Sequence, residues 1–311
     1  VTWGDVTAGG DSSAVQEQLK HVQHIQASAA AFAAVRSDAS VVTWGCVDHG
    51  GDSSSVHDHL HNVTQIQASS QAFAAIRSDG SVMTWGHAMF GGDNSAVRHQ
   101  LLDVQQIQAS VAAFAAIRRD GSVVTWGDAE YGGDSSCIQH QLQNVQHLQS
   151  SECAFAAIRS DGSVVTWGDA LLGGDSSAVQ DRLHGVQQIQ ASSGAFAAIL
   201  YDGSVVTWGS TWFGGDSSAV QDQLQDVQQI QVSGGAFAAI RSDGSVVSWG
   251  NSEYASDSAA LCNELRDVQQ IQATQGAFAA IRSDGRVVTW GKTNHGGNSI
   301  ELQAFQAMAA R

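Results

Sequence analysis

The chain has 311 residues with no proline, 43% hydrophobic residues and only 14% charged residues, so it has enough apolar side chains to form a core. Its 14 Lys and Arg against 30 Asp and Glu give a formal net charge of −16, which argues against nucleic acid and anionic membranes as partners. No apolar run approaches the roughly 20 residues of a membrane-spanning helix, so we expect no insertion into a membrane.

A repeat of 41 residues begins at the first residues of the chain and continues almost to its end. A fixed period in this range is typical of a solenoid, a propeller or a linear array. The tryptophans of the Trp-Gly dipeptides keep this step without exception: Trp3, Trp44, Trp85, Trp126, Trp167, Trp208, Trp249 and Trp290. The phenylalanines keep it at Phe32, Phe73, Phe114, Phe155, Phe196, Phe237 and Phe278.

The copy at 145–185 shows the elements of one repeat in chain order. The segments 145–150 (VQHLQS), 154–159 (AFAAIR) and 163–168 (SVVTWG) read as three short strands. An Asp-Gly pair between the second and third strands predicts a two-residue hairpin turn in which both central residues have positive φ. The first copy has Asp38-Ala39 instead, and we expect strain there because alanine tolerates positive φ poorly.

A connector follows the third strand of each copy and leads to the next repeat. It starts with a variable tetrapeptide and usually continues with Gly-Gly-Asp-Ser-Ser. Ser13 followed by Gln16 fits a capping box, and Val15 with Leu19 forms an apolar i,i+4 pair, so we predict a short helix. A fourth, outer strand is the competing interpretation. Three to four short antiparallel strands per repeat predict an all-β, seven-bladed β-propeller with a short connecting helix in each blade.

The repeated pattern V–QIQAS–AFAAI–SDGSVVTWG–GG resembles the repeat of the regulator of chromosome condensation family over essentially the whole chain. That resemblance implies a propeller with one repeat per blade. The spacing is shorter than in most members, and Ala-Phe stands in the second strand where a His-Ser/Thr pair is common. The family includes an exchange factor for a small GTPase and propellers of ubiquitin ligases. The strict 41-residue step leaves no room for the exchange wedge, and no ligase domain is present, so neither activity is expected here.

The ends of the chain do not match a whole number of repeats. There are seven pairs of first and second strands but eight third-strand segments, of which the extra one is Val1–Gly4. We expect residues 1–311 to form one propeller domain in which the two ends meet in one blade and residues 292–311 are a partial repeat and tail. Because the chain begins at Val1, it is expected to be a processed product or part of a longer protein.

The copies differ most in two places, the tetrapeptide after each Trp-Gly and the turn between the first and second strands. In an antiparallel blade both places lie on one face, and the uniform Asp-Gly turns lie on the other. Tyr and Trp are enriched in binding hot spots, so we predict that this variable face binds a partner. The predicted binding residues are His49, Phe90, Glu130, Tyr131, Leu172, Trp212, Phe213, Glu253, Tyr254 and His295. Unrestrained drift of surface loops is the plainer alternative.

Other residues are weaker candidates for a site. Six arginines share one register and form either an anion-binding ring or structural pairs with nearby aspartates, which we favour: Arg36, Arg77, Arg118, Arg159, Arg241 and Arg282. His57 and His61 would share a helical face, yet another copy has glutamines there, and no metal site is predicted. The four cysteines occupy different repeat positions, so no disulfide framework is expected.

The expected function is non-catalytic binding of a protein partner, as a scaffold and in a larger assembly, with no cofactor. A carbohydrate-binding propeller is the alternative, because Tyr131, Trp212 and Tyr254 could stack on sugar rings. A lectin would be expected to repeat one pocket in every blade, whereas the tetrapeptides differ from blade to blade. We find no arrangement of nucleophile, base and acid that predicts an enzyme.

Overall fold

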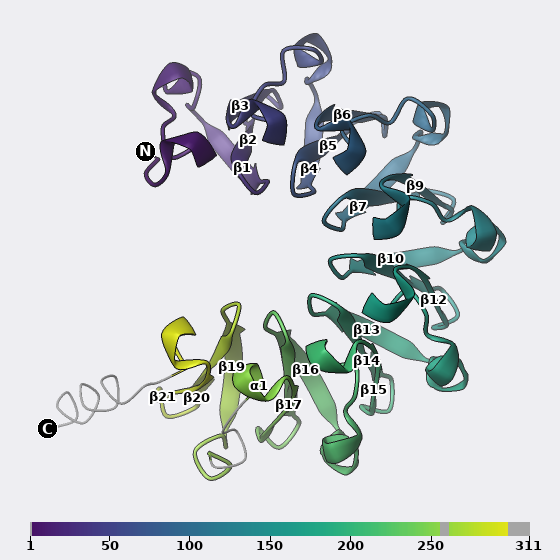
Figure 1. The fold of residues 1–311 in the computed structure, drawn as a ribbon, viewed down its shortest axis with the longest axis vertical. Coiled ribbons are helices and arrows are strands. Elements are labelled where there is room, and N and C mark those ends of the chain that lie inside the picture. The colour runs from purple at the N-terminus through teal and green to yellow at the C-terminus, as the bar shows by residue number, and fades with distance from the viewer. Residues whose placement is uncertain (1, 256–260, 298–311) are drawn as a thin grey trace, which may run out of the picture. The chain divides into compact units, whose positions relative to one another are not determined.

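The computed structural model describes residues 2–255 and 261–297, and its strands form seven three-stranded antiparallel sheets (Figure 1). We call these sheets blades one to seven in chain order, and the strands of each blade follow one another in sequence. They are β1 (Val22–Ala27), β2 (Ala31–Arg36), β3 (Val41–Gly45); β4 (Val63–Ala68), β5 (Ala72–Arg77), β6 (Val82–Gly86); β7 (Val104–Ala109), β8 (Ala113–Arg118), β9 (Val123–Gly127); β10 (Val145–Ser150), β11 (Ala154–Arg159), β12 (Val164–Gly168); β13 (Val186–Ala191), β14 (Ala195–Leu200), β15 (Val205–Gly209); β16 (Val227–Val232), β17 (Ala236–Arg241), β18 (Val246–Gly250); and β19 (Val268–Ala273), β20 (Ala277–Arg282), β21 (Val287–Gly291). The fold class is therefore all-β with seven propeller blades, as predicted.

The connectors hold short helices, almost all of the 3₁₀ type. They are η1 (Val6–Ala8), η2 (Ser13–Val15), η3 (Val47–His49), η4 (His57–His59), η5 (Ala88–Phe90), η6 (Arg98–Gln100), η7 (Ala129–Tyr131), η8 (Ser136–Gln141), η9 (Ala170–Leu172), η10 (Ser177–Arg182), η11 (Thr211–Phe213), η12 (Ser218–Gln223), α1 (Ser252–Ala255) and η13 (Thr293–His295). The predicted connecting helix is thus confirmed, and no described sheet has a fourth strand.

The start of the connecting helix differs from the predicted capping box. Ser13 does not cap it; the N–H of Ser13 donates instead to Oδ1 of Asp11 at 2.8 Å. Ser12 donates from its hydroxyl to Oε1 of Gln16 at 3.2 Å. The Asp of the Gly-Gly-Asp-Ser-Ser motif therefore closes a local Asx turn, which competes with a regular helical cap.

The chain divides into two compact units, residues 1–160 with 167–169 and residues 161–166 with 170–311. Blades one to three belong to the first unit and blades five to seven to the second. The expectation of one domain over residues 1–311 stays a prediction. The extra third-strand segment predicted at Val1–Gly4 does not form a strand over its described residues 2–4. Of the predicted tail, residues 298–311 lie outside the described residues.

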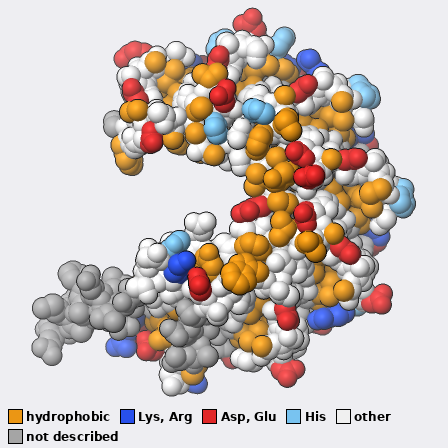
Figure 2. All heavy atoms as spheres, in the orientation of Figure 1, with side chains coloured by type: hydrophobic (Ala, Val, Ile, Leu, Met, Phe, Trp, Pro, Cys, Tyr) orange, Lys and Arg blue, Asp and Glu red, His pale blue; other side chains and the backbone are white. Residues whose placement is uncertain are grey.

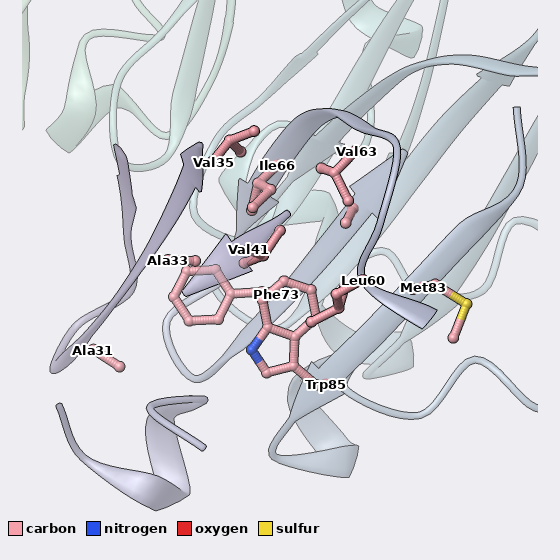
Figure 3. Close-up of a cluster of buried hydrophobic side chains, with 11 residues drawn as sticks. Ala31, Ala33, Val35, Val41, Leu60, Val63, Ile66, Phe73, Met83 and Trp85 are labelled. Carbon is pink, nitrogen blue, oxygen red and sulfur yellow. The ribbon is translucent and has the colours of Figure 1, made fainter. Parts of the chain in front are cut away.

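Each core lies between consecutive blades rather than within one blade. Between blades one and two, Val35 and Val41 of the first blade pack with Ile66 and Phe73 of the second and with Leu60 of the connector that joins them (Figure 3). The same arrangement recurs between blades two and three, five and six, and six and seven. Both faces of an inner blade are therefore buried, which explains why the second and third strands are apolar at successive positions.

In blades one to six, one aromatic pair and one glycine attach the blade to the connector before it. In blade two, Phe73 on β5 stacks on Trp85 on β6, with ring centroids 5.2 Å apart and planes 15° apart. Nε1 of Trp85 donates to the carbonyl oxygen of Gly50 at 3.0 Å. Gly50 has a φ of +90°, and a Cβ there would be 2.6 Å from Cδ2 of Phe73. The connector can cross the ring only because this residue lacks a side chain.

The hairpin between the second and third strands differs from the predicted two-residue turn. In blade two the N–H of Gly80 donates to the carbonyl of Arg77, and Gly80 has a φ of +76°, whereas Asp79 does not have a positive φ. A turn followed by one left-handed residue needs only that residue to be glycine. In blade one the left-handed residue is Ala39, with a φ of +61°. The alanine at which the sequence predicted strain therefore has the unfavourable positive φ.

Changing Ala39 to glycine is expected to raise the free energy of unfolding by roughly 0.5–1 kcal/mol, because relief of the left-handed strain exceeds the added entropy of the unfolded chain. Ala29→Gly is the matched control, since Ala29 is exposed in a turn and does not have a positive φ. Urea unfolding of both variants measures the difference. Equal changes in the free energy of unfolding of the two variants would contradict the explanation that Ala39 is strained.

The two end blades keep one apolar surface exposed. Ile25 in β1 is 58% exposed, whereas Ile66 at the same position of blade two is 7% exposed. At the other end, Ile281 in β20 is exposed, whereas Ile240 at the same position of blade six is buried. Trp3, which is not itself in a strand, is 85% exposed. Burial at these repeat positions thus depends on having a neighbouring blade.

Candidate functional site: the variable rim

The two variable segments of each blade lie against one another at the same end of the strands. We call these segments, the tetrapeptide after Trp-Gly and the turn between the first and second strands, the variable rim. In blade two the N–H of His87 donates to the carbonyl of Gln71 at 2.9 Å, and the hydroxyl of Ser69 donates to the carbonyl of Phe90 at 2.8 Å. The Asp-Gly hairpins join the opposite ends of the strands. The predicted separation of variable and uniform segments is therefore confirmed in the blade.

The same backbone contact holds the rim in every blade. The first tetrapeptide residue donates its N–H to the last residue of the turn, over 2.8–3.0 Å: Cys46 to Ala30, His87 to Gln71, Asp128 to Ala112, Asp169 to Cys153, Ser210 to Gly194, Asn251 to Gly235 and Lys292 to Gly276. Because these bonds use only main-chain atoms, the side chains can vary without loss of the loop conformation.

Backbone bonds also connect the turns of neighbouring blades. In the first unit the N–H of Ser70 donates to the carbonyl of Val111, and that of Val111 to Glu152, both at 2.9 Å. In the second unit the carbonyl of Gly234 accepts from the N–H of Ser193 at 3.2 Å, and the N–H of Gly234 donates to the carbonyl of Gln275 at 2.8 Å. The rim of each unit is thus a continuous backbone surface, on which the side chains of adjacent blades have fixed spacing.

The fourth tetrapeptide residue is partly buried, which the sequence did not reveal. The half-buried predicted residues are His49, Phe90, Tyr131, Leu172, Phe213, Tyr254 and His295. Phe90, Phe213 and Tyr254 pack against the cores between blades, so part of their role is structural. A Cβ at Gly194 would be 2.6 Å from Cδ2 of Leu172 and 2.7 Å from Cδ2 of Phe213, so these two side chains lie next to each other over the turn.

The third tetrapeptide residue points outward, and it supplies the exposed groups of the rim. Of the predicted residues, Glu130, Trp212 and Glu253 hold this position and are exposed. Two exposed apolar residues at the same position were missed, Met89 and Leu171. Their signal in the sequence was the register within the tetrapeptide, because the short helix directs the third tetrapeptide residue to solvent and the fourth toward the core.

The rim also contains an aromatic and charged cluster in blades six and seven. Nζ of Lys292 lies 5.5 Å from the ring centroid of Tyr254 and 3.4 Å from Oε2 of Glu253. Gly276 lies below this cluster, since a Cβ there would be 2.9 Å from Nδ1 of His295. In Figure 2, hydrophobic, acidic and basic side chains lie side by side on the face of the second unit that carries α1.

Most arginines of the shared register lie beside the aspartate of the hairpin that follows them. Five of them form ion pairs of 3.3–3.6 Å with the aspartate two residues later: Arg36, Arg77, Arg118, Arg241 and Arg282. In blade two, Ser81 donates its hydroxyl and its N–H to Asp79, and these bonds lower the pKa of that carboxyl more than Arg77 does. The aspartates therefore stay ionised beside the arginines, which makes a free anion-binding ring a poor description of these pairs.

The histidines and cysteines singled out in the sequence form neither a metal site nor a disulfide within the described residues. Within residues 2–255 and 261–297, no three His, Cys, Asp or Glu side chains are grouped so that they could hold a metal ion, and all four cysteines are free thiols. Burial, with Glu152 and Asp169 nearby, raises the pKa of Cys153 to about 11, so its thiol is protonated at neutral pH. In the described part of the chain, no helix has the length and hydrophobicity to span a bilayer.

Comparison with known proteins gives likenesses to solved structures alone. No protein-family model and no curated protein matches the sequence. The ectodomain of the receptor kinase CR4 from Physcomitrella patens is 15% identical, with 87% of this chain and 74% of that chain covered and a TM-score of 0.49. Prp20p from Saccharomyces cerevisiae, described with its binding to Gsp1p and histones, is 15% identical, with 89% and 73% covered and a TM-score of 0.48.

A second structure of Prp20, described as yeast RCC1 bound to Kap60, is 14% identical, with 89% of this chain and 71% of that chain covered and a TM-score of 0.48. The resemblance to the regulator of chromosome condensation family, inferred from the repeat, thus recurs among the solved structures. The assignment of the fold depends on the seven sheets themselves and not on these scores.

Proposed function

We propose that this protein is a non-catalytic binding module that holds a protein partner on its variable rim. The observation that carries the proposal is the hydrogen bonding that joins the tetrapeptide of each blade to the adjacent turn, because it places the two most variable segments of a blade on one face. Exposed apolar residues there, Met89, Leu171 and Trp212, cost free energy in water and become favourable when a partner covers them.

The rim also suits recognition rather than catalysis. Its backbone is held by main-chain bonds, so the exposed side chains are presented without a large loss of entropy on binding. The tetrapeptides differ from blade to blade, which supports one extended partner in preference to a set of identical small-molecule pockets. A protein of this kind would act as a scaffold in a larger assembly.

The test compares a rim variant, Met89→Ser with Leu171→Ser and Trp212→Ser, with a control variant on the opposite face. Tyr201→Ser is the matched control, because Tyr201 is a 75% exposed aromatic beside an Asp-Gly hairpin. In pull-downs from an extract, the intact protein and the control are expected to recover the same proteins, and the rim variant to lose them. All changed residues are exposed, so each variant should unfold within about 0.5 kcal/mol of the intact protein.

Recovery of the same proteins by the rim variant, or their loss with Tyr201→Ser, would contradict the proposal. A glycan array with the intact protein gives an independent check. Selective binding to one sugar that is lost in the rim variant would replace the protein partner by a carbohydrate.

A further inference from the structure

The second unit carries a patch of four apolar side chains on the connectors after blades four and five. Leu171 and Trp212 hold the same outward position in η9 and η11 and are 81% and 65% exposed. Leu172 and Phe213, the next residue in each connector, are half-buried and meet over Gly194. We call these four residues the Leu171–Trp212 patch.

The base of this patch is fixed. The hydroxyl of Ser192 donates to the carbonyl of Phe213 at 2.7 Å, and the N–H of Ser210 donates to the carbonyl of Gly194 at 2.9 Å. Phe213 also packs against the core between blades five and six. Two outward side chains thus stand on a rigid apolar base, an arrangement that can receive one bulky apolar side chain from a partner.

The first charged residue that follows each outward residue of the patch in sequence is acidic. An exposed aspartate follows each outward residue by four positions, Asp175 after Leu171 and Asp216 after Trp212. Each accepts a bond of 2.8–2.9 Å from the N–H of a serine two residues later, and this bond lowers the pKa of the carboxyl, so both are ionised at neutral pH. Over residues 170–255 there are eight acidic and two basic residues, and one of the basic ones, Arg241, is paired with Asp243.

We infer that the Leu171–Trp212 patch binds a partner segment in which an aromatic or aliphatic residue is flanked by lysine or arginine. The apolar side chain contacts Leu171 and Trp212 above Phe213, and the cationic groups face Asp175 and Asp216. An acidic segment would be repelled by the same carboxylates, so charge sets the choice of partner. This inference deepens the proposed function and depends on it.

The test uses a random peptide library displayed on phage, selected on the intact protein and counter-selected on a Leu171→Ser, Trp212→Ser double variant. The enriched peptides are expected to contain an apolar residue next to basic residues. A synthetic peptide of the most enriched sequence should bind the double variant at least about tenfold more weakly than it binds the intact protein. It should bind Tyr201→Ser as it binds the intact protein, and its affinity should fall as the salt concentration rises.

Enrichment of acidic or uncharged peptides, absence of any enrichment, or unchanged affinity for the double variant would overturn the inference. A different result distinguishes failure of this inference from failure of the proposed function. If peptides selected on the intact protein without the counter-selection lose affinity on Met89→Ser but not on the double variant, binding on the rim stands and the Leu171–Trp212 patch is excluded.

Discussion

Replacing Trp85 by alanine is expected to lower the free energy of unfolding by about 3–5 kcal/mol, the largest effect expected for a single substitution in this chain. Trp85 is 2% exposed and stacks on Phe73, so its removal leaves a cavity between blades one and two. It also removes the Nε1–H that Gly50 accepts, which leaves the carbonyl of the connector without its partner. Urea unfolding followed by circular dichroism measures the loss.

The repeat supplies a control for this change in the same chain. Trp3 occupies the same repeat position as Trp85 but is 85% exposed. Trp3→Ala should therefore change the free energy of unfolding by no more than about 0.5 kcal/mol. A Trp85→Phe variant should fall between the two, since it keeps an aromatic ring but not the donor. Similar losses for Trp3→Ala and Trp85→Ala would show that the tryptophan stabilises the chain by some means other than packing between blades.

The second large effect is expected for Gly50→Ala, which should cost at least about 2 kcal/mol. Two causes act together, because Gly50 has a φ of +90° and its new Cβ would meet Phe73 at 2.6 Å. The ring of Phe73 is held by Trp85 and cannot move away without breaking the stack. Thermal or urea unfolding of the variant gives the cost.

Gly296→Ala separates the two causes. Gly296 is the equivalent glycine after blade seven, with a φ of +100°, and no heavy atom of the described residues lies within 4 Å of the position that its Cβ would take. Its replacement should cost only the backbone term of about 1–2 kcal/mol. Combining Gly50→Ala with Phe73→Ala should show favourable coupling, because the shortened side chain leaves room for the methyl group. Additive losses in that double variant would contradict the steric explanation.

The strands were predictable because their cause is local and is repeated. The segments 145–150 and 154–159 proposed from the sequence coincide with β10 and β11, and the third segment differs from β12 by one residue at its start. Repetition supplied what one sequence usually lacks, since positions that stay apolar in every copy reveal the core. The Phe and Trp positions identified in this way form the cross-strand stacked pairs of single blades, which belong to the cores between blades.

The details of the loops were harder to predict. The Asp-Gly pair predicted two residues with positive φ, yet only Gly80 of the pair in blade two has one, because Asp79 uses its carboxylate to hold Ser81. The same applies to the connector, where Asp11 closes an Asx turn in place of the predicted cap. Side-chain bonds to nearby main chain can stabilise several alternative turns, and composition alone does not choose between them.

Within the rim, the sequence identified the variable segments but not which residue of each is exposed. Trp212 and Phe213 were both assigned to binding, yet only Trp212 is mainly exposed, and Leu172 was chosen where its neighbour Leu171 is the outward residue. The difference follows from the direction of a single 3₁₀ turn, which residue types do not determine. The side chains of Leu172 and Phe213 also make the base on which the exposed pair stands.

The exposed isoleucines of the end blades, Ile25 and Ile281, have a consequence for how such a chain can change in length. Every inner blade contributes one interface before it and one after it, so the stability of the array grows by a nearly constant increment per unit. Deleting or duplicating one complete 41-residue unit would recreate the same junction at a new place in the sequence. Evolution could therefore lengthen or shorten this protein by whole blades, with melting expected to begin at whichever blades are terminal.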